Sequence, residues 1–302
     1  MKILITGAAG QLGKELCVQL EQGGSALGPL PERLQSATVI PVDIADADLT
    51  DRRQAAALVR RHAPDAVIHC AAYTNVDGAE TDPDTAFAVN ALAPRNMAMA
   101  CEEAGAKLIH LSTDYVFNGT GTRPFTEGDL PAPQSVYGST KLLGEQYVRA
   151  FCTRWFIVRT SWLYGRYGNN FVRTMLRLSA ERDELTVVND QHGNPTSAVD
   201  LAHHLLKLTP TKEYGLYHCT GNGTCTWYDF TCEIMQQAGR ATKITPVSSA
   251  AYAAKAGKPV ANRPANSALE HTMLRATVGD EMRPWKEALA EFIEAEKRDG
   301  NI

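Results

Sequence analysis

The fold is decided at the start of the chain by the sequence KILITGAAGQLG, residues 2–13. Its first residues form a short β-branched run that predicts a strand, and a turn with Gly7, Gly10 and Gly13 follows. Leucines then recur every four residues, the spacing of one helix face. A helix N-terminus offers free N–H groups and a positive dipole end to a pyrophosphate. The glycine spacing is G-x-x-G-x-x-G rather than the G-x-G-x-x-G of the dinucleotide-binding fingerprint. We nevertheless predict dinucleotide binding, because the turn lies between a first strand and a first helix.

The rest of the chain continues to alternate strands with helices. A helix over residues 84–104 begins behind Thr81-Asp82-Pro83, a capping side chain followed by proline. We therefore predict an α/β fold, a Rossmann-type doubly wound parallel sheet with a smaller α/β substrate-binding lobe toward the C-terminus. Further strands are predicted at residues 39–42, 66–70, 107–112, 156–160 and 215–219. The predicted dinucleotide-binding domain comprises residues 1–164, with 196–239 rejoining it, and the lobe comprises residues 165–195 and 240–302.

Composition favours small-molecule chemistry. The 302 residues are 44% hydrophobic and 21% charged, and the formal net charge is −4. This charge gives no basic field for a nucleic-acid backbone, and no Lys/Arg run suggests a membrane surface. No apolar run reaches the roughly 18 residues of a membrane span, and the first residues lack the apolar core of a signal peptide. The seven cysteines are scattered without C-x-x-C spacing, which favours reduced thiols over a metal site. We therefore expect a cytoplasmic protein.

The stretch from Ser112 to Lys141 carries the candidate chemistry. A helix places Tyr137 and Lys141 one turn apart on the same face, so that an ammonium can lie beside a phenol. The ordinary pKa of tyrosine, about 10, is too high for rapid proton transfer at neutral pH. A cation about 4 Å away at an effective dielectric of about 20 would favour tyrosinate by roughly 4 kcal/mol. We therefore expect Lys141 to lower the pKa of Tyr137 toward the working pH, where Tyr137 can exchange a proton.

The cofactor side leaves two choices open. Asp43 follows a predicted strand, where it is either a cofactor contact or only a cap. Some 20 residues after the glycine turn, where an acid would hold the ribose of NAD, the chain has Glu32-Arg33. Arg33 would suit a 2′-phosphate, which favours NADPH with NADH as a substitute; an exposed, uninvolved arginine is the alternative. Asn90, in an otherwise apolar helix, either carries a proton-relay water or kinks the helix.

Several motifs together resemble one family. The set resembles the extended short-chain dehydrogenase/reductases and, within them, the dTDP-4-dehydrorhamnose reductases. The likeness runs along nearly the whole chain and is specific as a set. Its motifs are the glycine turn, Ala71-Ala72-Tyr73-Thr74-Asn75-Val76-Asp77, Ser112-Thr113-Asp114-Tyr115-Val116-Phe117, Tyr137 to Lys141, Arg159-Thr160-Ser161-Trp162 and Arg263-Pro264-Ala265-Asn266-Ser267-Ala268-Leu269.

The resemblance implies a reaction and its residues. The reaction is NAD(P)H-dependent reduction of the 4-keto group of dTDP-6-deoxy-L-lyxo-4-hexulose to dTDP-L-rhamnose, for cell-surface polysaccharide. Tyr137 would donate the proton, Lys141 would also hold the nicotinamide ribose, and Thr113 would hydrogen-bond the carbonyl oxygen. The implied substrate contacts are Thr113, Asp114, Trp162, Asn170 and Arg263. The expected cofactor contacts are Gly7, Gly10, Gln11, Leu12, Gly13, Asp43, Ile44, Ala71, Ala72, Tyr73, Thr74, Tyr137 and Lys141.

Two other functions share parts of this pattern, and the family also raises the question of a metal. A nucleotide-sugar 4,6-dehydratase or epimerase shares the Tyr-x-x-x-Lys pair, but the dehydratase pattern has an adjacent Asp-Glu pair where Asp114 is followed by Tyr115. A relative of the regulatory subunit of methionine adenosyltransferase would share the cofactor fold and act as a binding partner. Some family members are Mg²⁺-linked homodimers; of the positions involved Glu15 matches, whereas Val199 stands where a glutamate is expected. We assign no catalytic metal.

Overall fold

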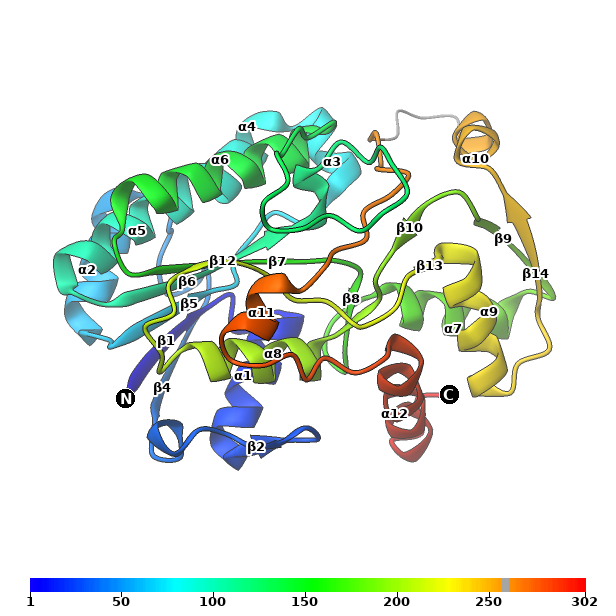
Figure 1. The fold of residues 1–302 in the computed structure, drawn as a ribbon. Coiled ribbons are helices and arrows are strands. Elements are labelled where there is room, and N and C mark those ends of the chain that lie inside the picture. The colour runs from blue at the N-terminus through cyan, green and yellow to red at the C-terminus, as the bar shows by residue number, and fades with distance from the viewer. Residues whose placement is uncertain (257–260) are drawn as a thin grey trace.

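A parallel sheet forms the centre of the molecule, as the computed structural model shows for residues 1–256 and 261–302 (Figure 1). In the order β12-β7-β6-β5-β1-β4, all neighbouring strands are parallel. The strands are β1 (Lys2–Thr6), β4 (Thr38–Val42), β5 (Ala66–His69), β6 (Lys107–Thr113), β7 (Trp155–Thr160) and β12 (Gly215–His218). The predicted doubly wound sheet is therefore confirmed, and the strand order reverses beside β1, which places a ligand crevice at that point.

Helices cover both faces of the sheet. One face carries α1, α8 and α11, and the other carries α2, α5 and α6 (Figure 1). Their bounds are α1 (Gln11–Gln22), α2 (Arg52–His62), α5 (Ala93–Ala104), α6 (Val136–Phe151), α8 (Ala198–Leu208) and α11 (Thr272–Ala276). Short elements complete this part: β2 (Gly24–Ser25), β3 (Gly28–Pro29), α3 (Val76–Thr81), α4 (Pro83–Phe87) and the single turns Glu32–Leu34 and Asp114–Val116.

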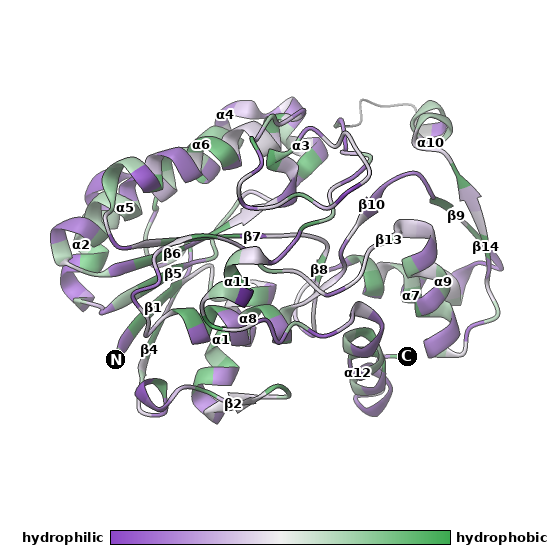
Figure 2. Ribbon diagram, viewed as in Figure 1, coloured by the Kyte–Doolittle hydropathy of each residue, from purple (hydrophilic) through white to green (hydrophobic). Residues whose placement is uncertain are grey.

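Alternation along the strands builds two apolar layers. Ile3 and Ile5 of β1 belong to the core with α1 and α8, while Leu4 between them belongs to the core with α2 and α5. All three side chains are fully buried, and each such burial contributes roughly 1.5–3 kcal/mol. The covering helices α2, α5 and α6 alternate between hydrophilic and hydrophobic positions, as helices with one buried face do (Figure 2).

The helix predicted over residues 84–104 is interrupted by a π-helical turn. Asp82 caps its start by accepting the N–H of Thr85 at 3.1 Å, as the Asp-Pro pair predicted. The π turn, Ala88–Leu92, joins α4 to α5. Asn90 lies in this turn and is fully buried. Such turns are frequent at functional sites, and this one faces the site described below.

The smaller lobe is built from elements of the second half of the chain. Its parallel strand pair β9–β14 is covered by α7 and α9, and α12 packs on α9. Two strand pairs, β8–β11 and β10–β13, connect the lobe to the sheet (Figure 1). The bounds are β8 (Leu163–Tyr164), α7 (Phe171–Glu181), β9 (Glu184–Val188), β10 (His192–Gly193), β11 (Thr196–Ser197), β13 (Cys225–Thr226), α9 (Trp227–Ala238), β14 (Lys243–Val247), α10 (Ser249–Ala256) and α12 (Trp285–Arg298).

Residues 196–239, which we expected to rejoin the dinucleotide-binding part, divide between the two parts. Helix α8 packs on α1, and β12 adds the outermost strand of the sheet. Helix α9 differs from the expectation, because its apolar face of Phe230, Ile234 and Met235 shares a core with α7 and α12. Conversely, Leu274 and Met282, which lie in the segment predicted for the lobe, pack in the core of the sheet beside α8.

The length and apolar character of the helices can be compared with those of a membrane span. Across residues 1–256 and 261–302, none of them combines the length and the apolar character that a membrane crossing requires.

Candidate active site

A cavity of about 790 Å³ opens beyond the carboxyl ends of β1, β4, β5 and β6. Fifteen of the eighteen predicted site residues line it, brought together from the glycine turn, the ends of β4, β5 and β6, α6 and the entry to β8. Tyr73, Asn170 and Arg263 lie outside the lining set. The predicted residues that line it are Gly7, Gly10, Gln11, Leu12, Gly13, Asp43, Ile44, Ala71, Ala72, Thr74, Thr113, Asp114, Tyr137, Lys141 and Trp162.

The glycine turn brings the N-terminus of α1 to the cavity. Gly7 has a φ of +64°, and a Cβ on Gly13 would lie 2.2 Å from the carbonyl oxygen of Gly7, so both positions exclude larger side chains. Gly10 is the N-cap of α1 and supplies no capping side chain. The first N–H groups of the helix are therefore left for an anion, the arrangement that dinucleotide pyrophosphates require.

Asp43 serves the turn as a cap. Its carboxylate accepts the N–H of Ala9 at 2.8 Å and that of Ile44 at 2.8 Å. Ile44 is 84% exposed although it lines the cavity, so its apolar side chain offers a flat contact for a ring. The segment from Ala47 to Thr50 lines the cavity as well, and the sequence contained no signal that would have singled it out.

Arg33 does not reach this site. Its charge acts on Lys107, which opens β6 at the amino end of the strands, whereas the cavity lies at the carboxyl ends. The proposed contact of Arg33 with a 2′-phosphate is therefore wrong. The reason is that a short hairpin and a single helical turn lie between α1 and β4, so the second strand ends farther along the chain than the 20-residue spacing assumes.

The π turn fixes the loop after β5. The Asn90 amide accepts the N–H of Tyr73 at 2.9 Å and donates to the carbonyl of Tyr73 at 3.0 Å. It also reaches the hydroxyl of Thr140 on α6 at 3.4 Å. Asn90 thus lies in the π turn that interrupts the helix and also holds a loop, a role that neither alternative included, and its bonds hold Ala72 and Thr74 at the cavity wall.

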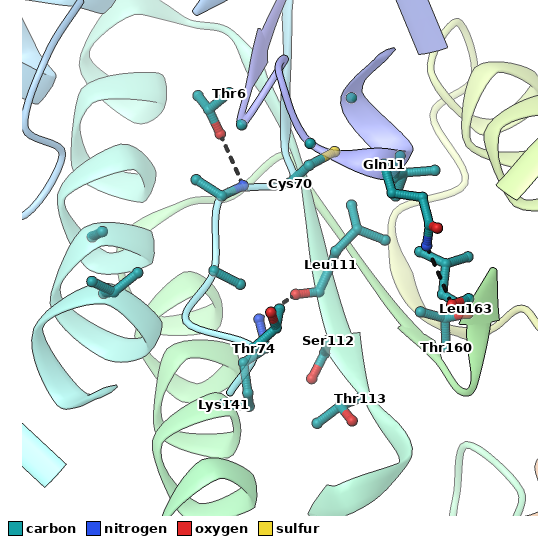
Figure 3. A pocket seen from close by; sticks show the side chains of 18 of the residues that line it. Thr6, Gln11, Cys70, Thr74, Leu111, Ser112, Thr113, Lys141, Thr160 and Leu163 are labelled. Atoms are coloured by element: carbon teal, nitrogen blue, oxygen red, sulfur yellow. Dashed lines mark hydrogen bonds between the residues drawn. The ribbon is translucent and has the colours of Figure 1, made fainter. Parts of the chain in front are cut away.

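The catalytic candidates come from β6 and α6. Lys141 donates from Nζ to the carbonyl oxygen of Leu111 at 2.6 Å, and Figure 3 shows the two groups pointing toward each other. Thr113 ends β6 and donates to Asp114 Oδ1 at 3.0 Å. The ring of Tyr137 lies edge-on to that of Tyr115, with centroids 5.5 Å apart. Hydroxyl, phenol and ammonium therefore face one cavity.

The pKa values in this cluster differ from the sequence-based expectation. Burial raises the pKa of Tyr137 to about 12, while a hydrogen bond with Thr113 acts in the opposite direction. Burial lowers the pKa of Lys141 to about 8, although the Glu145 carboxylate favours its charged form. The expected lowering of the Tyr137 pKa by Lys141 was wrong for this structure, because the ammonium is bound to the Leu111 carbonyl and desolvation of the phenol dominates.

Asp114 is a buried carboxyl beside Thr113. Only 2% of it is exposed, and its Oδ2 has no hydrogen-bond partner among the described residues. Burial raises its pKa to about 6, against hydrogen bonds from Ser267 and Thr113. An unpartnered buried carboxylate oxygen is costly, which disfavours the charged form of Asp114.

A buried ion pair supports these residues from behind. Glu145 lies one turn after Lys141 and accepts from Arg159 at 2.8 and 2.7 Å and from Ser112 at 2.6 Å. Both charged side chains are at most 2% exposed. The network ties α6 to β6 and β7, and so fixes Lys141 relative to Thr113.

The lobe side of the cavity is aromatic. Trp162 and Trp227 both line it. Trp227 was missed by the sequence reasoning, since a tryptophan at the start of a helix has the ordinary appearance of a core residue. Asn170 caps α7 and donates to Gln11 Oε1 at 3.0 Å, so it acts on the cavity through Gln11.

Arg263 forms an ion pair at the edge of the site. Its guanidinium donates to both carboxylate oxygens of Asp77, at 2.9 and 3.1 Å. Asp77 follows Val76, a cavity-lining residue, and the Arg263 charge acts on Tyr115, which also lines the cavity. Arg263 therefore lies close to the cavity.

Glu15 is not a surface carboxylate. Only 6% of it is exposed, it accepts from Gln19 at 2.9 Å, and burial raises its pKa. In the part of the chain that the structure describes, no group of three or more His, Cys, Asp or Glu side chains is arranged to hold a metal ion.

Comparison with known proteins identifies the family of the chain. The family model described as RmlD substrate binding domain matches residues 1–298. A dTDP-4-dehydrorhamnose reductase from Streptomyces griseus is 40% identical over 97% of this chain and 93% of its own length.

Two solved structures extend the match to the fold. A dTDP-4-dehydrorhamnose reductase from Clostridium acetobutylicum is 45% identical with a TM-score of 0.90, covering 98% of this chain and all of its own. Another from Bacillus anthracis, in complex with NADP, is 41% identical with a TM-score of 0.90, covering 97% and 99%. The chain therefore belongs to the RmlD substrate binding domain family, together with the dTDP-4-dehydrorhamnose reductases that it resembles along its whole length.

Proposed function

We propose that the protein is an oxidoreductase that reduces the 4-keto group of dTDP-6-deoxy-L-lyxo-4-hexulose to dTDP-L-rhamnose, with NADPH as the reductant. The observation that carries this proposal is the single cavity that joins the glycine turn to Thr113, Tyr137 and Lys141. The reductases named above support the substrate, and the complex of the Bacillus anthracis protein with NADP supports the cofactor.

The residues present fit a dinucleotide. The uncapped start of α1 and the side-chain-free surface at Gly10 suit a pyrophosphate. Exposed Ile44 suits the adenine ring, and the backbone from Ala71 to Thr74, held by Asn90, suits the ribose and nicotinamide. NADPH, when bound, supplies the hydride. We expect NADH to act as a substitute, because no arginine that would select for the 2′-phosphate lines the cavity in the described residues.

Tyr137 is the proposed proton donor. Its raised pKa keeps the phenol protonated at neutral pH, and the oxygen that develops negative charge during reduction is more basic than tyrosinate. Thr113 places a hydroxyl beside the phenol, where it can bind the same oxygen. Lys141, with its pKa of about 8, is charged at neutral pH and stabilises the tyrosinate that remains.

The alternatives require features that the site does not offer. A 4,6-dehydratase needs an acid and a base side by side, whereas Asp114 is followed by Tyr115, whose ring packs on Tyr137. A purely regulatory partner would not need Thr113, Tyr137 and Lys141 in one cavity. We keep both as outcomes of the test.

The test is a reaction with the purified protein, NADPH and the 4-keto sugar nucleotide. We expect one NADPH to be oxidised for each dTDP-L-rhamnose formed, followed by absorbance and by NMR of the product. Isomerised or dehydrated sugar without net oxidation of NADPH would indicate an epimerase or dehydratase. A protein that binds NADPH but converts no sugar would indicate the partner role, which pull-down from the native extract would then examine.

A further inference from the structure

Trp162 has a backbone conformation that a tryptophan rarely adopts. Its φ is +46°, and Ala63 is the one other residue besides glycine with positive φ in the described part of the chain. Left-handed backbone is unfavourable for a bulky side chain and persists where the surroundings enforce it. Trp162 lies two residues after Thr160, the last residue of β7, and Thr160, Ser161 and Trp162 all line the cavity. The strain therefore lies at the site itself.

Two neighbours enforce this conformation. The indole of Trp227 stacks on that of Trp162, with centroids 3.5 Å apart and ring planes within 8°. A Cβ on Gly193 would lie 2.5 Å from the same indole, so the backbone of β10 packs directly against the Trp162 ring. The Trp162 carbonyl also accepts the N–H of Thr196 at 3.2 Å. Trp162 thus lies between the first turn of α9 and the segment from β10 to β11.

Trp227 is itself well anchored. It opens α9 directly after a capping box, in which Thr226 and Asp229 bond each other's backbone N–H. Phe171 packs against its ring with centroids 4.4 Å apart. The smaller lobe therefore holds the Trp162 indole through one fixed aromatic contact.

We propose that Trp227 is a positioning residue, which stacks on Trp162 to hold that indole where the sugar of the substrate binds, in the cavity that Tyr137 also lines. This inference rests on the proposed function. An indole presents an apolar face to the C–H groups of a sugar ring, and a fixed indole orients the ring without the entropy loss of ordering a mobile side chain. Trp227 thus makes the lobe part of the specificity for a deoxysugar nucleotide.

The first test measures the stack and then its effect on kinetics. Stacked indoles give an exciton couplet in the circular dichroism spectrum, which Trp227→Phe should remove while Trp155→Phe keeps it. Trp155 is the control because it contacts Arg149 and does not line the cavity. In Trp227→Ala we expect a rise of about 3- to 10-fold in KM for the sugar nucleotide, the size of one aromatic pair. The KM for NADPH should not change, and Trp227→Phe should recover most of the loss.

A double-mutant comparison tests whether Trp227 acts through Trp162. If it does, Trp162→Ala combined with Trp227→Ala should bind sugar no worse than Trp162→Ala alone. Gly193→Ala, which leaves Trp227 intact, should also raise the sugar KM, because its Cβ displaces the indole. This variant replaces Trp227→Ala if the latter fails to fold.

Three results would overturn the proposal. They are additive losses in the double mutant, an unchanged sugar KM in folded Trp227→Ala, and a couplet that survives in Trp227→Phe. A wild-type protein that shows the couplet but reduces no keto sugar would instead refute the proposed function, and the positioning role with it.

Discussion

The two halves of the cavity are built in different ways. The cofactor half consists mainly of backbone: the glycine turn, the uncapped start of α1 and the loop after β5. The substrate half consists of side chains from β6, α6, the entry to β8 and α9, and it contains the buried Asp114, the buried Lys141 and the strained Trp162. One half therefore depends on space around glycines, whereas the other depends on the placement and protonation of individual groups.

The largest effect should come from the substrate half. Tyr137→Phe removes the proton donor but keeps the ring that packs on Tyr115. We expect kcat to fall by roughly 10²- to 10⁴-fold, the range of a lost general acid, with NADPH affinity nearly unchanged. Steady-state kinetics and NADPH titration by fluorescence measure the two quantities. Near-normal turnover of the keto sugar would show that another group donates the proton.

The matching change in the cofactor half is Gly10→Val. Its side chain would stand on the surface that the pyrophosphate approaches and bring its Cβ within 3.1 Å of the Gly7 carbonyl. We expect NADPH affinity to fall by about 100-fold, or ~2.7 kcal/mol, while the protein stays folded. Calorimetric titration of NADPH with a thermal melt as control decides this. Tight binding by a folded variant would mean that the cofactor site lies elsewhere.

The same difference explains what the sequence could predict. The cofactor half was predictable because its residues are local, with strand, turn and helix following one another within residues 2–22. Tyr137 and Lys141 were found by helical spacing, and the role of Thr113 came from the family resemblance. The sheet followed from the same alternation, since a strand buried on both faces has a recognisable apolar run.

The errors in the prediction arose from contacts across the fold. Arg33 was misplaced because an intervening hairpin delays β4. The pKa of Tyr137 was misjudged because burial of the phenol raises it, and because the partner of Lys141 is the backbone carbonyl of Leu111; no residue pattern reveals either. Trp227 was missed because its partner is Trp162, distant along the chain and brought close only by the lobe. Contacts between side chains of the sheet and of the lobe therefore cannot be predicted from the sequence pattern and become visible only in the structure.

A smaller effect should appear in stability. Asp114 has a pKa of about 6 in the folded protein and 3.8 as its ordinary value, so the folded state binds the proton more tightly. Its contribution to the free energy of unfolding therefore decreases as pH rises from about 4 to 6 and remains low above that. Asp114→Asn should stabilise the protein by roughly 2–3 kcal/mol at pH 7.5, and much less at pH 4. Urea unfolding at both pH values tests this, and equal effects at the two would contradict it.

The smallest expected effect concerns Arg263, which lies at the edge of the substrate half. Its ion pair with Asp77 is only partly buried, with 27% and 37% of the two side chains exposed, so the pair itself contributes at most ~1 kcal/mol to stability. A substrate diphosphate, like the Asp77 carboxylate, offers a pair of oxygens to a guanidinium, and it carries more negative charge. It can therefore replace Asp77 as the hydrogen-bond partner of Arg263. We therefore propose that Arg263 binds the diphosphate.

Arg263→Ala should accordingly raise the sugar KM by about 10-fold, or ~1.4 kcal/mol, and leave the NADPH KM unchanged. Arg263→Lys should recover only part of the loss, because an ammonium cannot make the two parallel bonds of a guanidinium. Arg177→Ala is the matched control, since Arg177 pairs with Glu181 on the exposed face of α7 and should alter neither constant. Binding energy at the distant diphosphate also orients the keto group for reduction, so kcat should fall as well. If the sugar KM and kcat both stay at their wild-type values, Arg263 only forms the ion pair with Asp77 and does not bind the substrate.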